Sequence, residues 1–252
     1  MNQSPQADYD VIILGAGAAG LFCAATAAKR GRRVLVLEKA NKIGKKILMS
    51  GGGRCNFTNQ FVEADNFISD NPHFCKSALS TYTQWDFIDL VEQHHIEYEE
   101  REHGQLFCVH SAKDIVAMLK TECELSSVEI KTHCDVNNVA DSKSDAHDNC
   151  YRVEIAQGPS EPRETRTISC HSLVIASGAL SVPTLGGSGI GYEIAKQFKL
   201  EVTDLRSGLV PFMFSDFMKP LCGRLSGSSL EVEIRCNGRA FTEQLLFTHR
   251  GI

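Results

Sequence analysis

The sequence has no surplus of basic residues, because 26 Lys and Arg stand against 31 Asp and Glu, for a formal net charge of -5. A protein whose main role is to bind nucleic acid needs lysine and arginine to neutralise phosphates, so no nucleic-acid partner is expected. The 252 residues are 42% hydrophobic and 23% charged, which excludes a disordered or collagen-like chain. These numbers favour a globular protein, of one large domain or slightly more, that acts on a small-molecule substrate.

Paired metal-binding or redox motifs are also lacking. The ten cysteines form no CxxC pair and show no zinc-ligand spacing. The histidines show no ligand spacing either, so no metal site is expected. Free thiols are typical of the reducing cytoplasm, which is the predicted location. Nothing in the sequence indicates an oligomeric state.

An uncharged run at residues 11–28 is long enough to span a membrane. Three glycines interrupt it, and Asp8 and Asp10 precede it where a secretory signal would carry positive charge. We therefore expect neither a membrane span nor an exported leader.

A βαβ unit explains this run better. Residues 10–14 (DVIIL) and 32–38 (RRVLVLE) are short and apolar, as strands buried on both faces are. Between them, residues 21–30 have high helix propensity and stop at Gly31. Strand, glycine turn, helix and strand within thirty residues predict a right-handed crossover.

The rest of the chain continues as a mixture of helices and strands. Residues 39–60 show no clean period and are expected to be irregular and functional. The remaining predicted helices are at 74–95, from Ser111 to about 124 and at 189–198. A hairpin is predicted at 96–109, with Gly104 near its turn. The remaining predicted strands form an antiparallel meander at 129–139, 151–156 and 165–169, followed by a strand at 172–179 that runs into glycine. Residues 1–8 are expected to be a disordered tail, residues 9–200 one α/β domain and residues 201–252 the start of a β-rich domain.

The turn after the first strand reads GAGAAG and matches the dinucleotide-binding pattern G-x-G-x-x-G. Gly15 would allow the tight turn, Gly17 would let the backbone approach a diphosphate, and Gly20 would let helix and strand pack closely. The helix that starts near Ala18 and Ala19 would direct its N-terminal N–H groups at the phosphates.

An acid at the end of the second strand supports this interpretation. Glu38 follows Gly20 by 18 residues, and Lys39 comes directly after it. A carboxylate there accepts hydrogen bonds from ribose hydroxyls, and the alternative is an exposed strand-end carboxylate. The pattern predicts a dinucleotide and does not choose between FAD and NAD.

A second glycine-rich stretch, GKKILMSGGGRCNFTN at residues 44–59, is the feature that bears on the choice between FAD and NAD. Its three consecutive glycines can present N–H groups to a flat ring or an anion, whereas the alternative is a flexible surface loop. A third cluster at residues 186–191 fails the dinucleotide pattern, because Tyr192 stands where the last glycine would be. We expect a turn and a helix start there, and no dedicated NAD(P)H domain.

Five segments together resemble the BaiN/RdsA family of FAD-binding oxidoreductases, also called the aminoacetone oxidase or YhiN-like family. They are GAGAAG, KKILMSGGGRCNFTN, GQLFCVHSAKDIV at 104–116, LVIASGALSVPTLGGSGIGYEIAKQF at 173–198 and LFTHRGI at 246–252. The resemblance implies a Rossmann-like FAD-binding domain at 9–200, with a parallel sheet and an antiparallel crossover meander, and the start of an inserted β-rich domain at 201–252. Family members continue past LFTHRGI, so the resemblance also implies that a C-terminal part is lacking.

The same resemblance implies a set of cofactor-binding residues. It places the first glycine turn on the FAD diphosphate, Glu38 at the adenosine ribose, the strand around Val136 at the adenine, and residues 51–56 near the flavin end. The full set is Gly15, Gly17, Ala18, Ala19, Gly20, Glu38, Lys39, Gly51, Gly52, Gly53, Arg54, Cys55, Asn56, Val136, Ala176, Ser177 and Gly178. Ser177-Gly178-Ala179 stands where the family usually has T-G-G.

The flavin ring would carry the redox chemistry, while the protein orients it and places charge near it. Arg54, with Asn56 beside it, is the candidate catalytic group, because a cation after three glycines could stabilise the reduced flavin. Cys55 has no C-x4-C partner, so disulfide chemistry is not expected. The predicted function is an FAD-dependent oxidoreductase that transfers hydride to or from a small organic substrate, with NAD(P)H as a transient donor. The alternatives are a flavin-binding protein without catalysis and an NAD-dependent dehydrogenase.

Overall fold

A computed structural model describes residues 7–141, 150–181, 187–208 and 210–252. The chain divides into two compact units, Met1–Glu201 and Val202–Ile252. Among the described residues, no helix is long and apolar enough to cross a membrane.

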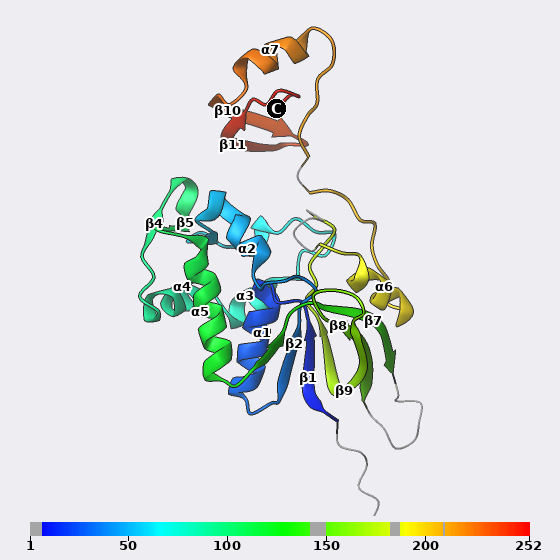
Figure 1. The fold of residues 1–252 in the computed structure, drawn as a ribbon. Helices are drawn as coiled ribbons and strands as arrows, with labels where there is room; N and C mark the ends of the chain where they lie inside the picture. The colour runs from blue at the N-terminus through cyan, green and yellow to red at the C-terminus, as the bar shows by residue number, and fades with distance from the viewer. Residues whose placement is uncertain (1–6, 142–149, 182–186, 209) are drawn as a thin grey trace, which may run out of the picture. The chain divides into compact units, whose positions relative to one another are not determined.

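The first unit is built on a six-stranded sheet (Figure 1). Four strands run parallel, in the order β6-β2-β1-β9, and two more extend the sheet beyond β9, with β8 antiparallel to β9 and β7 antiparallel to β8. The strands are β1 (Tyr9–Leu14), β2 (Val34–Leu37), β6 (Glu129–Lys131), β7 (Cys134–Asp141), β8 (Tyr151–Gln157) and β9 (Glu164–Ile175). This arrangement confirms the predicted α/β Rossmann-like fold with its antiparallel meander.

Two strand predictions need correction. The predicted strands at 165–169 and 172–179 are one strand, β9, which is antiparallel to β8 up to Cys170 and parallel to β1 from there on. The predicted strand at 129–139 is two strands, because His133 takes a left-handed φ of 55° and separates β6 from β7. Of these two strands, β6 pairs with β2 in the parallel part of the sheet.

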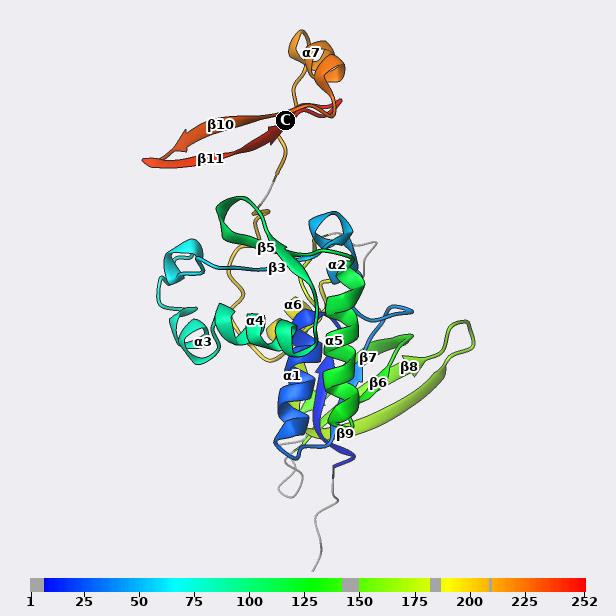
Figure 2. The same ribbon diagram turned by 90° about the vertical axis from the view of Figure 1, so that its left-hand side faces the viewer.

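Helices cover both faces of this sheet, as strands buried on both sides require. Val34 and Val36 of β2 face α1 (Ala18–Lys29) and α5 (Ala112–Leu125), which pack against each other (Figure 2). Leu35 and Leu37 face the opposite way, into a second core with α6 (Ile190–Gln197). Ser111 caps α5, accepting a hydrogen bond from the Lys113 amide, so that prediction is confirmed.

The segment between β2 and α5 forms a small three-stranded sheet, ordered β3-β5-β4, with short helices around it. The predicted hairpin is β4 and β5, joined through Gly104. Residues 39–60 are more regular than predicted, and the predicted helix at 74–95 breaks at Thr83, which caps a second helix with Asp86. The elements are α2 (Lys45–Met49), η1 (Ser50–Gly53), β3 (Asn56–Asn59), η2 (Ala64–Asn66), α3 (Lys76–Thr81), α4 (Gln84–Gln93), β4 (Tyr98–Glu100), η3 (Glu102–Gly104) and β5 (Gln105–Cys108).

The second unit contains α7 (Met218–Leu225) and an antiparallel hairpin of β10 (Ser229–Cys236) and β11 (Arg239–Leu246). Asn237 and Gly238 form its turn, both with positive φ, as a tight two-residue hairpin requires.

Most of the predicted tail, residues 1–6, lies outside the described residues. Ala7 is buried, and the Asp8 carboxylate accepts hydrogen bonds from the amide and the hydroxyl of Ser169, at 2.8 Å each. These two residues therefore belong to the folded first unit.

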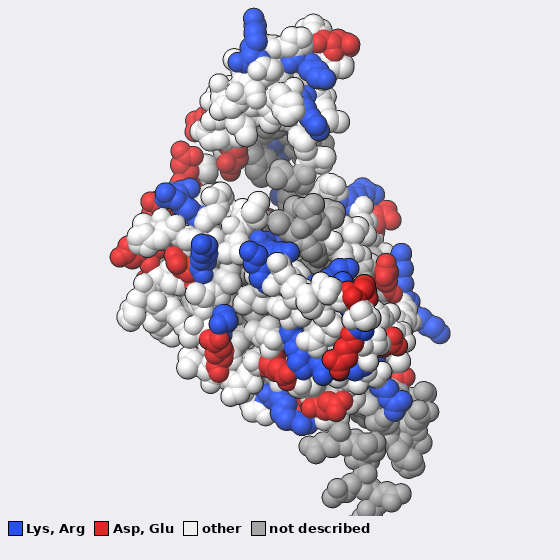
Figure 3. Space-filling view, viewed as in Figure 1, with Lys and Arg blue, Asp and Glu red and all other residues white. Residues whose placement is uncertain are grey.

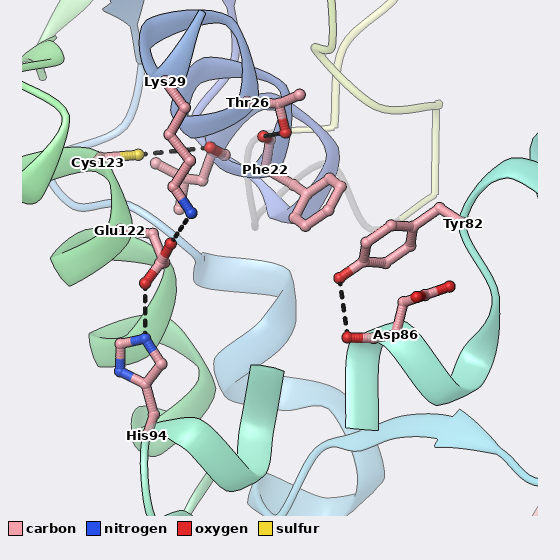
Figure 4. Close-up of polar contacts among 9 residues, drawn as sticks. Phe22, Thr26, Lys29, Tyr82, Asp86, His94, Glu122 and Cys123 are labelled. Atoms are coloured by element: carbon pink, nitrogen blue, oxygen red, sulfur yellow. Dashed lines mark hydrogen bonds and ion pairs between the residues drawn. The ribbon is translucent and has the colours of Figure 1, made fainter. Parts of the chain in front are cut away.

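A buried carboxylate joins three helices (Figure 4). Glu122 of α5 accepts hydrogen bonds from Lys29, at the end of α1, and from His94 Nε2, at the end of α4, the latter at 2.7 Å. Glu122 is only 8% exposed. The hydrogen bond from Lys29 lowers the pKa of Glu122, and the bond from His94 acts in the same direction against the effect of burial.

We predict that Glu122→Gln destabilises the first unit at neutral pH by about 1–2 kcal/mol, because hydrogen bonds to a charged acceptor are lost while Lys29 can turn to water. A carboxylate whose pKa is lowered on folding stabilises the protein at pH values above its ordinary pKa of 4.5. This stabilisation is lost as the pH falls through the lowered pKa of the folded state. The loss should therefore shrink in acid. Urea unfolding at neutral pH and at about pH 4 measures both effects.

The matched control is Glu124→Gln on the same helix, because Glu124 forms an exposed i,i+4 pair with Lys120. It should change the free energy of unfolding by less than about 0.5 kcal/mol. Equal losses in the two variants would contradict the role given to Glu122.

Candidate functional site

A cleft of about 390 Å³ opens at the carboxyl ends of β1, β2 and β9. In doubly wound folds this edge of the sheet is where nucleotides bind. The cleft brings together eight residues that the sequence singled out: Gly15, Gly17, Glu38, Lys39, Val136, Ala176, Ser177 and Gly178.

The turn from β1 into α1 has no room for side chains at two positions. Gly15 has a φ of +107°, and a Cβ there would lie 2.5 Å from the carbonyl oxygen of Ala176. A Cβ on Gly20 would lie 1.9 Å from the carbonyl oxygen of Gly15. Gly20 is buried and lies behind the cleft, so its role is to let the helix approach the sheet.

The middle glycine differs from the other two. Gly17 is the N-cap of α1, and a Cβ there would meet nothing within 4 Å. No side chain caps α1, and its first turn contains no acid. Its first N–H groups and the positive end of the helix dipole are thus available to an anion, which fits a diphosphate.

Glu38 is held at the lip of the cleft by two backbone amides. Its Oε2 accepts a hydrogen bond from the Ala16 N–H at 2.8 Å, and its Oε1 accepts one from the Ala40 N–H at 2.7 Å. Each carboxylate oxygen can accept a second hydrogen bond. A ribose could therefore bind without displacing either amide.

Lys39 is already paired with a protein carboxylate. Its Nζ lies 3.0 Å from Asp135, next to Val136, and Arg163 contacts the same carboxylate. Burial alone would raise the pKa of Asp135, but the hydrogen bonds from Lys39 and Arg163 outweigh burial and lower it. Lys39 thereby joins the end of β2 to β7, where the adenine was expected.

The segment that follows β9 and borders the glycine turn contains a polar atom without a partner among the described residues. The Ser177 hydroxyl oxygen is buried and makes no hydrogen bond with the described residues. Gly178, which follows it and also lines the cleft, has a positive φ of 78°. A buried hydroxyl without a partner is costly, so a ligand oxygen here would remove a penalty.

The residues expected at the flavin end do not line this cleft. Arg54 lies 3.6 Å from Glu99 of β4 and is half exposed. Gly51 and Gly52 have left-handed φ values of 55° and 64°, and a Cβ on Gly51 would lie 2.6 Å from the Phe107 ring. These glycines therefore serve the local chain path and the packing against β5.

Four other predicted residues, Ala18, Ala19, Cys55 and Asn56, line a second cavity of about 600 Å³, which we call the apolar hollow. Burial raises the pKa of the Cys55 thiol, so the thiol stays protonated and is a poor nucleophile. The hollow also contains five aromatic side chains: Phe22, Phe57, Phe67, Tyr82 and Phe87. Such a lining suits a planar ring.

Several cleft residues were not assigned to the site from the sequence. Lys42, Lys45 and Lys46 come from the loop after β2 and from α2, and Ser188, Gly189 and Glu193 come from the start of α6. Lys45 and Lys46 belong to the glycine-rich stretch at residues 44–59, and Lys42 lies just before it, so this stretch was the available signal. On the face shown in Figure 3, basic and acidic side chains are interspersed and form no broad surface of one sign.

The two kinds of glycine can be separated by substitution. We predict that Gly20→Ala destabilises the fold by about 2–4 kcal/mol, because the new Cβ would overlap the Gly15 carbonyl. Gly17→Ala should change the free energy of unfolding by less than about 1 kcal/mol, because its Cβ would point into open space. The same variant should weaken FAD binding about tenfold or more, because that space is the cleft in which the diphosphate would lie. Urea unfolding and FAD titration of both variants test this, and a Gly20→Ala protein of normal stability would contradict it.

Comparison with known proteins identifies the family of this chain. The model of the HI0933-like protein Rossmann domain matches residues 9–238. The chain is 49% identical over 248 residues to the ribosomal RNA dihydrouridine synthase of Escherichia coli K12, covering 97% of this chain and 58% of that protein. It is 48% identical to the protein of that name from Haemophilus influenzae, with 96% and 58% covered.

A more distant relative, the 3-dehydro-bile acid delta(4,6)-reductase of Clostridium scindens, is 27% identical, with 73% of this chain and 42% of that protein covered. The chain thus spans less than two thirds of the length of these relatives. Because the domain match covers most of its residues, the chain belongs to the family of the HI0933-like protein Rossmann domain.

Proposed function

We propose that this chain binds FAD in the cleft and that the protein reduces a carbon–carbon double bond conjugated to a carbonyl group, with uridine in ribosomal RNA as its substrate. The observation that carries the proposal is the 49% identity, over nearly the whole chain, to a relative named for this reaction. The cleft supports it, because its glycine turn and Glu38 match what a dinucleotide requires.

The described residues suit the parts of FAD in a definite order. The N-terminus of α1 would hold the diphosphate, Glu38 the adenosine ribose, and the backbone around Val136 the adenine. The flavin end would lie toward the apolar hollow, where Cys55 and Asn56 are found. Bound FAD, after it takes up two electrons from NADH or NADPH, would supply the hydride.

The reactions for which these relatives are named share one kind of chemistry. Forming dihydrouridine from uridine adds a hydride and a proton across a ring double bond that is conjugated to a carbonyl. A delta(4,6)-reductase of a 3-dehydro compound reduces double bonds conjugated to a ketone. Conjugation allows the carbonyl oxygen to take up negative charge when hydride arrives, so a hydrogen-bond donor near that oxygen lowers the barrier.

Among the predicted catalytic residues, Asn56 is the better candidate for that donor. It lines the apolar hollow, and its side-chain amide offers both a donor and an acceptor to a planar imide. Arg54 would first have to leave Glu99. The chain's own contribution would thus be to bind, orient and shield the reacting ring.

The net charge predicted a small-molecule substrate and no nucleic-acid partner. The proposed RNA substrate differs from both predictions. A cytoplasmic location and NAD(P)H as electron donor remain part of the proposal. The second candidate is reduction of a small conjugated ketone, which the more distant relative favours.

The test begins with purified protein and FAD. We expect a yellow complex that NADH or NADPH bleaches without oxygen and that then adds two hydrogens to a uridine of unmodified ribosomal RNA, detected by nucleoside mass spectrometry. Turnover of a conjugated ketone alone would favour the second candidate. Bound FAD without turnover would leave a flavin-binding protein, and no FAD binding would overturn the proposal.

A further inference from the structure

Lys46 is fixed close to the glycine turn by its backbone. It is the second residue of α2, whose N-cap is Gly44. The Gly44 N–H donates to the Ala16 carbonyl at 2.9 Å, inside the turn. Gly44 has a φ of +68°, and a Cβ there would lie 2.7 Å from Val116 of α5, so α2 starts tightly against the core. The position of Lys46 relative to the cleft is thus set by packing.

The ammonium group of Lys46 has only neutral partners. Its Nζ donates to Ser181 Oγ at 3.2 Å and to the Ala179 carbonyl at 3.4 Å. In the described part of the chain, no carboxylate lies within ion-pair distance of it. By contrast, Lys39, in the same cleft, is paired with Asp135 at 3.0 Å.

Such a group is incompletely compensated. An ammonium has three donors, and this one makes two long hydrogen bonds while half-buried. A partly desolvated charge is stabilised far better by an anion than by a carbonyl or a hydroxyl. The cleft therefore contains a cation whose best partner is absent from the protein.

Lys46 also occupies a special place between the two cavities. Among the described residues, it alone lines both the cleft and the apolar hollow. Its Nζ lies beside Gly178, 3.2 Å from where a Cβ on that residue would be. Gly178 follows Ala176 and Ser177, whose backbone lies against Gly15, and Gly15 and Lys46 both line the cleft.

We propose that Lys46 binds the diphosphate of FAD, its Nζ leaving Ser181 and Ala179 for phosphate oxygens. This rests on the proposed binding of FAD in the cleft. A diphosphate carries two negative charges, and a helix N-terminus supplies only about half a positive charge. Lys46 would supply a full charge at the point where the dinucleotide passes from the cleft toward the hollow.

Three ligands separate the possible contacts: FAD, ADP, which lacks the flavin, and riboflavin, which lacks the phosphates. We expect Lys46→Met to weaken FAD and ADP about 10- to 100-fold and to leave riboflavin unchanged. Lys46→Arg should restore most of the affinity. Lys113→Met, which removes the same charge from an exposed position on α5, should change nothing. Calorimetric titration gives the affinities, and thermal unfolding checks that each variant folds.

Unchanged FAD and ADP affinities in Lys46→Met would overturn the inference. So would weaker riboflavin binding with unchanged ADP binding, because the ammonium would then face the flavin ring. Failure of the proposed reduction is a separate result, since the ADP titration reads the diphosphate contact without any turnover. A wild-type protein that binds none of the three ligands would overturn both proposals.

Discussion

The close approach of the glycine turn to the end of β9 is the constraint on which the site depends. Gly15 lies against the carbonyl of Ala176, and Gly20 lies against the carbonyl of Gly15. Both contacts are backbone to backbone, so no side-chain adjustment could relieve a larger residue there. They bring α1 onto the sheet with its N-terminus at the carboxyl edge. The anion-binding character of the cleft is a consequence of this packing.

The local parts of the fold could be predicted from the sequence, and the long-range parts could not. The βαβ unit and the Ser111 cap of α5 depend on residues a few positions apart, and both were found. The strand β9 changes its partner from β8 to β1 at Cys170, and no turn residue marks that point. The division of β6 from β7 depends on His133 adopting a left-handed conformation, for which histidine gives only a weak signal.

The site shows the same division in its charges. The sequence drew attention to Arg54, because it follows three glycines, but Glu99 arrives beside it from a strand more than forty residues away. Lys46 received no role, and it is the cation left with neutral partners. Which of two cations is available to a ligand is decided by where the carboxylates fall after folding. That information is tertiary and lies in no motif.

The same reasoning limits what the net charge of the chain can say about the proposed RNA substrate. At physiological ionic strength a charge is screened within about 8 Å, so a site responds to its neighbours more than to the sum over 252 residues. The cleft is lined by Lys39, Lys42, Lys45 and Lys46 together with Glu38, Asp135 and Glu193, so its local charge differs from the net charge of -5 on the whole chain. The overall balance governs long-range attraction of a polyanion, which is a question of association rate. Recognition of a single base and its nearest phosphates depends on the local arrangement, which only the fold reveals.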